Sequence, residues 1–229
     1  MILSMHQPAY MPWLGYFDKI ARSDVFVYLD TVQFEKNSFI NRNQIKTLNG
    51  PQWLTIPVKT KGHTSATLLT TQIDDQQPWR KKHLKAIALS YSKSPFFESL
   101  YPELEKLILY DTSLLAELCW HQLNFWLNDL GIGTRVIRAS ELDIDSQKSD
   151  LVLDICSQLG CTTYLSGVLG RQYLVERDFD ERNIAIAYQD YKHPTYSQLG
   201  KDFTPYLSIL DYRLNNAPKQ QIYSPRTQE

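Results

Sequence analysis

Cysteine is scarce in this sequence, which has three among its 229 residues: Cys119, Cys156 and Cys161. Their number is odd and no CxxC pair occurs, which argues against a disulfide framework and against a thiolate zinc site. We therefore expect free, buried thiols in a reducing compartment.

Long apolar runs are also missing. No stretch reaches the roughly 18 apolar residues that a membrane-spanning helix needs. The opening MILSMHQPAYMPW has neither the basic start nor the apolar run of a secretory signal. These absences predict a cytoplasmic protein without a membrane partner.

Neither sign of charge dominates. Residues 1–115 carry 13 Lys and Arg against 10 Asp and Glu, and the remainder carries 11 against 15, for a net charge of −1. Neither half has the dense basic character of a nucleic-acid-binding domain, so we expect no nucleic acid partner. A small anionic substrate needs only two or three basic groups and is compatible with this balance.

Several well-known catalytic motifs are absent. The five histidines show no HExxH or other paired-ligand spacing, so no metal site is expected. The sequence also lacks the GxSxG nucleophile elbow, the phosphate loop of ATPases and the GxGxxG fingerprint.

The chain is long enough to bury roughly 70% of the surface that its unfolded form exposes. We expect one α/β domain over residues 1–215, with a helical insert at about 78–131. A flexible tail rich in Gln, Pro, Ser and Thr is expected over 216–229.

The first part of the chain predicts two parallel strands. Residues 2–5 and 25–29 are short apolar runs, and residues 13–21 between them have apolar positions at helical spacing after Pro12. This unit is sufficient for a right-handed crossover. Residues 39–45 and 53–58 flank a turn at 49–51 and predict an antiparallel hairpin, and residues 68–73 predict a further strand.

The middle of the chain predicts helices over 79–91, 96–110 and 114–130, the last capped by Ser113 and ended by Gly131. The last third predicts strands at 134–137, 163–165 and 184–188, and a helix over 150–159. The expected fold is therefore α/β, with a mostly parallel central sheet, a helical middle segment and an antiparallel hairpin.

The loop after the first predicted strand is the first candidate site. Ligands of open parallel sheets bind past the carboxyl ends of the strands, near unpaired N–H groups of helix starts. His6, Gln7 and Tyr10 could there bind a phosphate or a carboxylate. The alternative is a loop whose polar groups only satisfy the backbone. Asp30, which ends the next strand, either faces the same crevice or caps a surface turn.

A second candidate is the SGVLGR stretch over residues 166–171, which follows a later predicted strand. Ser166 opens the stretch, Gly167 and Gly170 let backbone N–H groups approach an anion, and Arg171 adds a fixed charge. A tight turn is the alternative.

A third candidate is the amide-rich stretch over residues 33–43. Lys36 and Arg42 could hold an anion there, while Asn43 and its neighbours fix the orientation of the ligand. The alternative is a solvated loop.

His193 is a fourth candidate, as a general base, because the unperturbed pKa of histidine lies near neutrality. The alternative is a structural histidine.

The opening HQPAYMPWLGYF, residues 6–17, resembles the signature of the WbqC-like protein family. The similarity extends over about residues 1–215. It includes residues 24–30, Gln33, Lys36, residues 41–43, residues 53–58, Ser166, Gly167, Gly170, Tyr173, Tyr191 and residues 193–196. The resemblance implies a bacterial protein of O-antigen and other surface-polysaccharide clusters. Glycyl transfer to a sugar amine is the activity suggested for the family.

A remoter resemblance concerns the fold. A first strand, a Pro-containing loop, an early helix and a second strand closing on Asp also describe nucleotidyltransferase-like folds, which hold ATP on an HxGH loop. Here the corresponding stretch reads PWLGY, with Tyr16 where the second histidine would stand. That departure weakens the case for nucleotidyl transfer.

The leading hypothesis is a transferase of surface-polysaccharide biosynthesis that moves a glycyl or acyl group to a sugar nucleotide. His6, Gln7 and His193 are its predicted catalytic residues. Its predicted binding residues are Tyr10, Lys36, Arg42, Asn43, Ser166, Gly167, Gly170 and Arg171.

The expected substrate is a small anion. ATP or a sugar nucleotide with Mg²⁺ is the cofactor class considered, and large apolar helices are compatible with a homodimer. Two rivals stay open. One is an ATP-dependent amino-acid adenylating or nucleotidyl-transfer enzyme, and the other is a non-catalytic ligand-binding protein of a glycan assembly complex.

Overall fold

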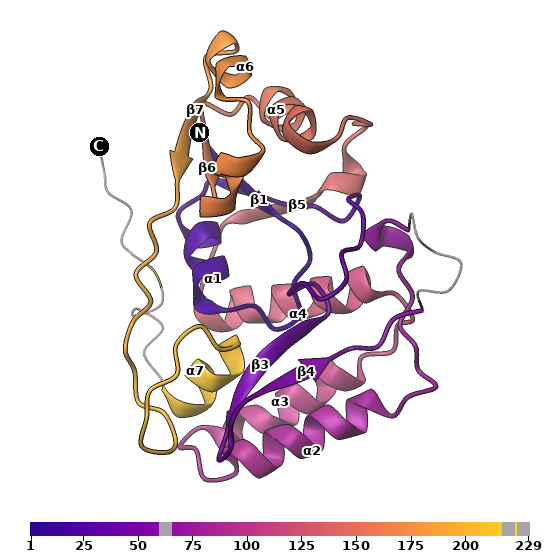
Figure 1. Ribbon diagram of the computed structural model, residues 1–229, viewed down its shortest axis with the longest axis vertical. Helices are drawn as coiled ribbons and strands as arrows, with labels where there is room; N and C mark the ends of the chain where they lie inside the picture. Colours follow the sequence, from indigo (N-terminus) through magenta and orange to yellow (C-terminus); the bar gives the residue numbers. More distant parts are fainter. Residues whose placement is uncertain (60–65, 217–222, 224–229) are drawn as a thin grey trace.

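The structure, a computed structural model, describes residues 1–59, 66–216 and 223. A five-stranded sheet lies at its centre (Figure 1). Its neighbouring strands are all parallel and lie in the order β5-β2-β1-β6-β7. The strands are β1 (Ile2–His6), β2 (Val25–Tyr28), β5 (Arg135–Arg138), β6 (Thr163–Ser166) and β7 (Ala185–Tyr188). The expected α/β class is confirmed, while the remote likeness to nucleotidyltransferase folds stays a prediction.

The strand order places a reversal between β1 and β6. From β1 the chain builds outward through β2 to β5, and it then returns to lay β6 and β7 on the other side of β1. Such a reversal is the topological switch point of a doubly wound sheet, and ligands of these folds bind past the carboxyl ends of the strands at that point.

Helices cover both faces of the sheet. The alternation along β2 shows this: Phe26 and Tyr28 pack with α1 (Leu14–Ala21) and α4 (Leu115–Leu130), whereas Val25 and Val27 pack with α5 (Lys148–Gln158) and α6 (Glu176–Glu181). Figure 1 shows α5 and α6 on one side of the sheet and α1 and α4 on the other.

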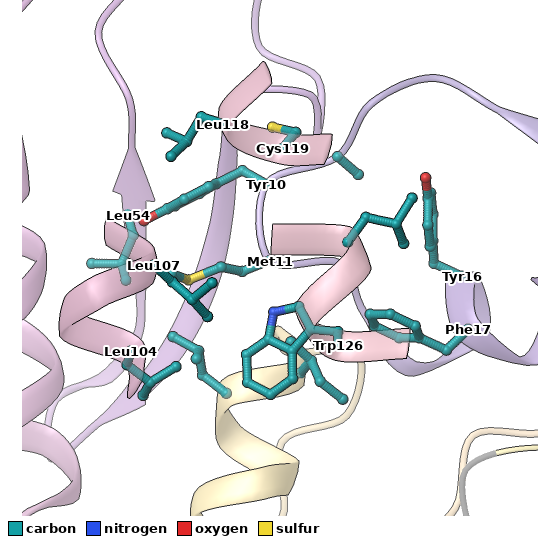
Figure 2. Packing of buried hydrophobic residues seen from close by; sticks show 14 of the residues in the cluster. Tyr10, Met11, Tyr16, Phe17, Leu54, Leu104, Leu107, Leu118, Cys119 and Trp126 are labelled. Atoms are coloured by element: carbon teal, nitrogen blue, oxygen red, sulfur yellow. The ribbon is translucent and has the colours of Figure 1, made fainter. Parts of the chain in front are cut away.

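The helical middle segment and the hairpin form a second layer beyond α4. Helices α2 (Trp79–Tyr91) and α3 (Phe97–Leu109) pack on each other, and α3 packs on α4. The antiparallel pair of β3 (Arg42–Thr47) and β4 (Gly50–Thr55) lies against α2 through β3. Figure 2 shows the shared core, in which Tyr10 and Trp126 are fully buried among leucines of α3 and α4. The predicted helices and hairpin are thus confirmed, with the turn one or two residues earlier than expected.

The strand predicted over residues 68–73 is wrong, because Leu68–Thr70 forms a 3₁₀ turn. The hydroxyls of Thr70 and Thr71 both donate to the carbonyl of Thr67. Such local side-chain bonds compete with strand pairing. Only isolated bridges involve the end of this stretch.

The predicted cap of α4 is also wrong. Leu114 is the N-cap residue and makes no side-chain cap bond, while the Leu115 N–H donates to the carbonyl of Thr71. The neighbouring segment therefore satisfies the helix start in place of Ser113. A further helix, α7 (Ile209–Asn215), was not predicted.

All three cysteines are free and buried, as predicted. Within the described part of the chain, no helix is long and apolar enough to cross a membrane. The predicted flexible tail falls mostly on residues 217–222 and 224–229, which lie outside the described residues.

Candidate functional site

The pairing between β1 and β6 ends before the last two residues of β1. Pairing between the two strands runs from Ile2–Thr163 to Ser4–Leu165, whereas β1 stays paired with β2 up to His6–Tyr28. The carbonyl of Met5 therefore lies past the last β1–β6 pair, at the switch point of the sheet.

Lys19 of α1 supplies the partner of this carbonyl. Its Nζ donates a hydrogen bond of 2.9 Å to the Met5 oxygen, and the residue is only 4% exposed. No carboxylate of the described residues lies within ion-pair distance of this ammonium group. The adjacent Asp18 instead accepts a bond from Gln189 and lies 3.7 Å from Arg22. Burial lowers the pKa of Lys19 to about 7.

His6 lies beside Lys19 on the same face of the sheet. Its ring contacts Tyr16 of α1, with 4.9 Å between centroids. Burial, together with the charge of Lys19, lowers the pKa of His6 to about 3, so the imidazole is neutral at pH 7. Its Nδ1 lies 2.9 Å from the carbonyl of Gln7, to which only a protonated nitrogen can donate. Nε2 therefore carries a lone pair, and no hydrogen-bond partner for it occurs among the residues that are described.

The pair combines a neutral base with an ammonium group that titrates near pH 7. His6 is half-buried, and its Nε2 can take a proton from a substrate group. The protonated Lys19 can neutralise an oxyanion next to it. Gln7, the third residue predicted here, contributes its carbonyl to His6 and, at 3.4 Å, to the Tyr16 hydroxyl.

The Ser166–Arg171 loop lies at the same edge. A Cβ atom at Gly170 would come within 2.0 Å of the Ser166 Oγ, so glycine is required there for the loop to fold over the end of β6. The Ser166 hydroxyl bonds to the Gly167 carbonyl. The Arg171 guanidinium lies 3.7 Å from the ring centroid of Tyr188, the last residue of β7. At ~4.8 Å per strand, β7 is about 10 Å from β1.

Tyr10 and Asn43 lie away from this edge. The Tyr10 hydroxyl is 2.9 Å from Nδ1 of His83 in α2, and its ring lies within the packed cluster of Figure 2. The Asn43 amide donates to the carbonyl of Met11. Both side chains are fully engaged in fixing the loop after β1 to the second layer, so they shape the site without facing it.

Lys36 and Arg42 belong to a segment that crosses from the end of β2 to the loop after β1, where the Tyr10 N–H bonds to the carbonyl of Phe39. Lys36 is exposed. Arg42 bonds to Asn37, and its guanidinium lies 4.3 Å from the ring centroid of Trp53. Among the described residues, no contact joins either cation to His6.

His193 has the geometry of a structural histidine. Its Nδ1 is 2.9 Å from the carbonyl of Pro194, and its Nε2 accepts the backbone N–H of Tyr206. Its loop is tied down by the Tyr196 hydroxyl, which donates to Asp211. Among the residues described, no contact joins His193 to His6.

Sequence reasoning missed two residues. Lys19 has a detectable signal, because Asp18 and Lys19 interrupt an apolar helix that is buried on every side from Leu14 to Ile20. Trp53 is 39% exposed and Phe39 is 51% exposed, and their rings are 5.7 Å apart. Alternation in the hairpin could have placed Trp53 on its outer face.

A search of the described ranges finds no group of three or more His, Cys, Asp or Glu residues able to hold a metal ion. Asp30 is the buried carboxylate at the end of β2, and its two oxygens accept the backbone N–H and the hydroxyl of Ser140. Asp30 therefore links the segment after β2 to the segment after β5 and is fully paired within the chain.

Comparison with known proteins covers most of the chain. The model of the WbqC-like protein family matches residues 7–223. The chain belongs to the WbqC-like protein family. An uncharacterized protein of Mycobacterium tuberculosis is 36% identical to this WbqC-like protein over 211 residues, which are 91% of each chain. The family match includes Lys19 and the Ser166–Arg171 loop, and it begins one residue after His6.

Proposed function

We propose that this WbqC-like protein is a transferase of bacterial surface-polysaccharide biosynthesis, of the O-antigen type, that moves a glycyl or other acyl group to the amine of a sugar nucleotide. One observation carries the proposal. A neutral imidazole with a free Nε2 lies beside a buried ammonium group at the switch point of a doubly wound sheet. Nucleotide-bearing ligands are characteristic of that position.

His6 accepts the proton of the attacking amine at Nε2. A bond forms between the amine nitrogen and the acyl carbon, the bond from that carbon to its leaving group breaks, and His6 returns the proton to the leaving group. In the free protein, burial and the Lys19 charge keep His6 a weak base. A bound anion offsets the Lys19 charge and raises the pKa of His6, so the base is activated when the substrate is present.

The exposed aromatic pair gives the amino-sugar nucleotide, which is the acceptor, a place to stack its rings. Phe39 and Trp53 present aromatic faces close to the loop that follows β1, and Arg42 lies over Trp53. Aromatic faces bind sugar and base rings by stacking. Arg42 and Lys36 add positive charge for the phosphates of the same ligand.

The test is turnover by His6→Ala with glycyl and acyl donors and amino-sugar nucleotides as acceptors. Because His6 Nε2 has no structural partner, we expect a fall of about 10²- to 10⁴-fold in kcat with the folded state retained. His193→Ala is the matched control, expected to keep turnover. If His6→Ala turned over at the wild-type rate, the proposed role of this site would be wrong.

A second candidate function is ATP-dependent activation of an amino acid. It is favoured by the strand order, which is that of many nucleotide-binding sheets. It predicts exchange of pyrophosphate into ATP that depends on an amino acid, measured with each amino acid in turn. Exchange with glycine and no acyl transfer from preformed donors would favour this candidate over the first.

A further inference from the structure

Lys19 is a feature of this edge that contacts among the described residues do not account for. An ammonium group carries three N–H donors. The structure gives the Lys19 group one acceptor, the carbonyl of Met5, although the residue is 4% exposed. A charge buried in this way is unfavourable unless something pairs with it.

The titratable and charged groups packed around Lys19 do not provide that pairing. On β1 the neighbour is His6, which is neutral. On α1, Tyr16 bonds to the carbonyl of Gln7, and Asp18 is engaged by Gln189 and approached by Arg22. The pKa of Lys19 is lowered by burial alone, with no opposing contribution from a carboxylate.

Lys19 also occupies the place where a ligand of this sheet type belongs. If the β1–β6 ladder continued, the Met5 carbonyl would accept an N–H from β6, since the Thr163 N–H bonds to the Met1 carbonyl two ladder steps earlier. Instead the pairing ends at Ser4–Leu165, and the Lys19 ammonium group donates to the Met5 carbonyl in place of a β6 N–H. His6, whose charge environment includes Lys19, is less buried than Lys19.

We propose that Lys19 is the anchor for an oxyanion of the substrate, a phosphoryl or a carboxylate group, which binds between the parted ends of β1 and β6. The proposal rests on the function proposed above and deepens it, because it names the group that the site holds. The oxyanion completes the pairing of Lys19 and lies within reach of His6 Nε2, where its charge favours the protonated imidazole during transfer.

The test compares Lys19→Met with the wild type by calorimetric titration of inorganic phosphate, pyrophosphate, sulfate, acetate and glycine. We expect Lys19→Met to lose at least tenfold in affinity for the oxyanion that the wild type binds. Binding of phosphate or pyrophosphate alone identifies a phosphoryl group as the natural partner, and binding of acetate or glycine alone identifies a carboxylate. Lys82→Met, which removes an exposed lysine of α2, is the control and should bind like the wild type.

Thermal unfolding without ligand provides the second readout. Methionine keeps the length and apolar volume of the lysine stem and removes the buried charge, so we expect Lys19→Met to melt several degrees above the wild type. A purely structural lysine predicts the opposite, a lower Tm. Unchanged anion affinity in Lys19→Met, or a Tm below that of the wild type, would overturn the proposal.

The two proposals fail in different ways. If Lys19→Met binds anions normally while His6→Ala abolishes turnover, the anchor is wrong and the transferase function stands. If the anion affinity depends on Lys19 and His6→Ala still turns over, the anchor stands and the catalytic role of His6 is wrong.

Discussion

The β2–β5 half and the β1–β6 half of the sheet edge differ in how their buried polar side chains are paired. Past β2 and β5, Asp30 accepts two bonds from Ser140, and Arg138 pairs with Glu117 while its guanidinium lies 4.5 Å from the ring centroid of Trp120. Past β1 and β6, Lys19 has a single carbonyl as its partner, and Nε2 of His6 has none among the residues that are described.

The difference fits a structural role for the β2–β5 half and the ligand-binding role proposed above for the β1–β6 half. Both halves end parallel strands with polar side chains, but in the β2–β5 half each buried group meets a complementary group of the chain itself. Such satisfied groups stabilise the fold. In the β1–β6 half Lys19 has one carbonyl partner and His6 Nε2 has none among the described residues, which costs stability and fits the ligand site proposed above.

The largest expected effect concerns the β2–β5 half of the edge and is a change in the free energy of unfolding. Asp30→Ala leaves the buried N–H and hydroxyl of Ser140 without their acceptor, and we expect the free energy of unfolding to fall by about 2–4 kcal/mol. Denaturant titration measures this loss. His6→Ala should change the free energy of unfolding by much less. Equal losses in the two variants would contradict the contrast.

The next largest effect is that of pH. Titration of Lys19 should raise the free energy of unfolding with pH and lower the affinity for an anion. The pKa of Lys19 is about 7 in the folded protein and 10.5 when unperturbed. Below pH 7 both states carry the charge and its full burial cost is present. Between pH 7 and 10.5 the unfolded chain binds more protons, so stability rises with pH.

Sulfate affinity should move the other way. Sulfate does not titrate in this range and binds the charged ammonium, so its affinity should fall by up to about tenfold for each pH unit above 7. In the folded protein His6, with a pKa of about 3, is neutral above pH 6, whereas the unfolded chain protonates it near 6.5, so the Lys19 slopes are read above pH 8. The difference between wild type and Lys19→Met isolates both slopes, and a flat difference in each would show that Lys19 does not titrate as the geometry requires.

The sheet edge itself was predictable from the sequence. Apolar runs at 2–5, 25–29 and 163–165 end in polar residues, and parallel pairing brings such ends together. This is why His6 and the Ser166–Arg171 loop were placed at the same edge. A short crossover joins β1 to β2, whereas β1 and β6 pair only because the chain returns to the other side of β1 after β5.

The sequence did not predict in which half of the edge the polar side chains would be paired with other groups of the chain. The partner of Asp30 is 110 residues away, and the partner of Tyr10 is 73 residues away on α2, which turns that tyrosine into the core. Lys19 was overlooked because a lysine in a short helix is usually solvated. Only the packing of α1 on the sheet buries it. These outcomes depend on long-range contacts that no local pattern contains.

The smallest expected effect tests where the site extends beyond the edge. Trp53→Ala removes an exposed ring of the hairpin, so the free energy of unfolding should change little. Affinity for the amino-sugar nucleotide acceptor should fall by about 5- to 100-fold, which corresponds to ~1–3 kcal/mol for one stacked ring. Titration of this acceptor measures the change, and Leu48→Ala, at a fully exposed position of the hairpin turn, is the control. A loss of acceptor affinity with unchanged affinity for inorganic phosphate would place the ring on Trp53 and the anion elsewhere. Unchanged acceptor affinity would confine recognition to the β1–β6 half of the edge.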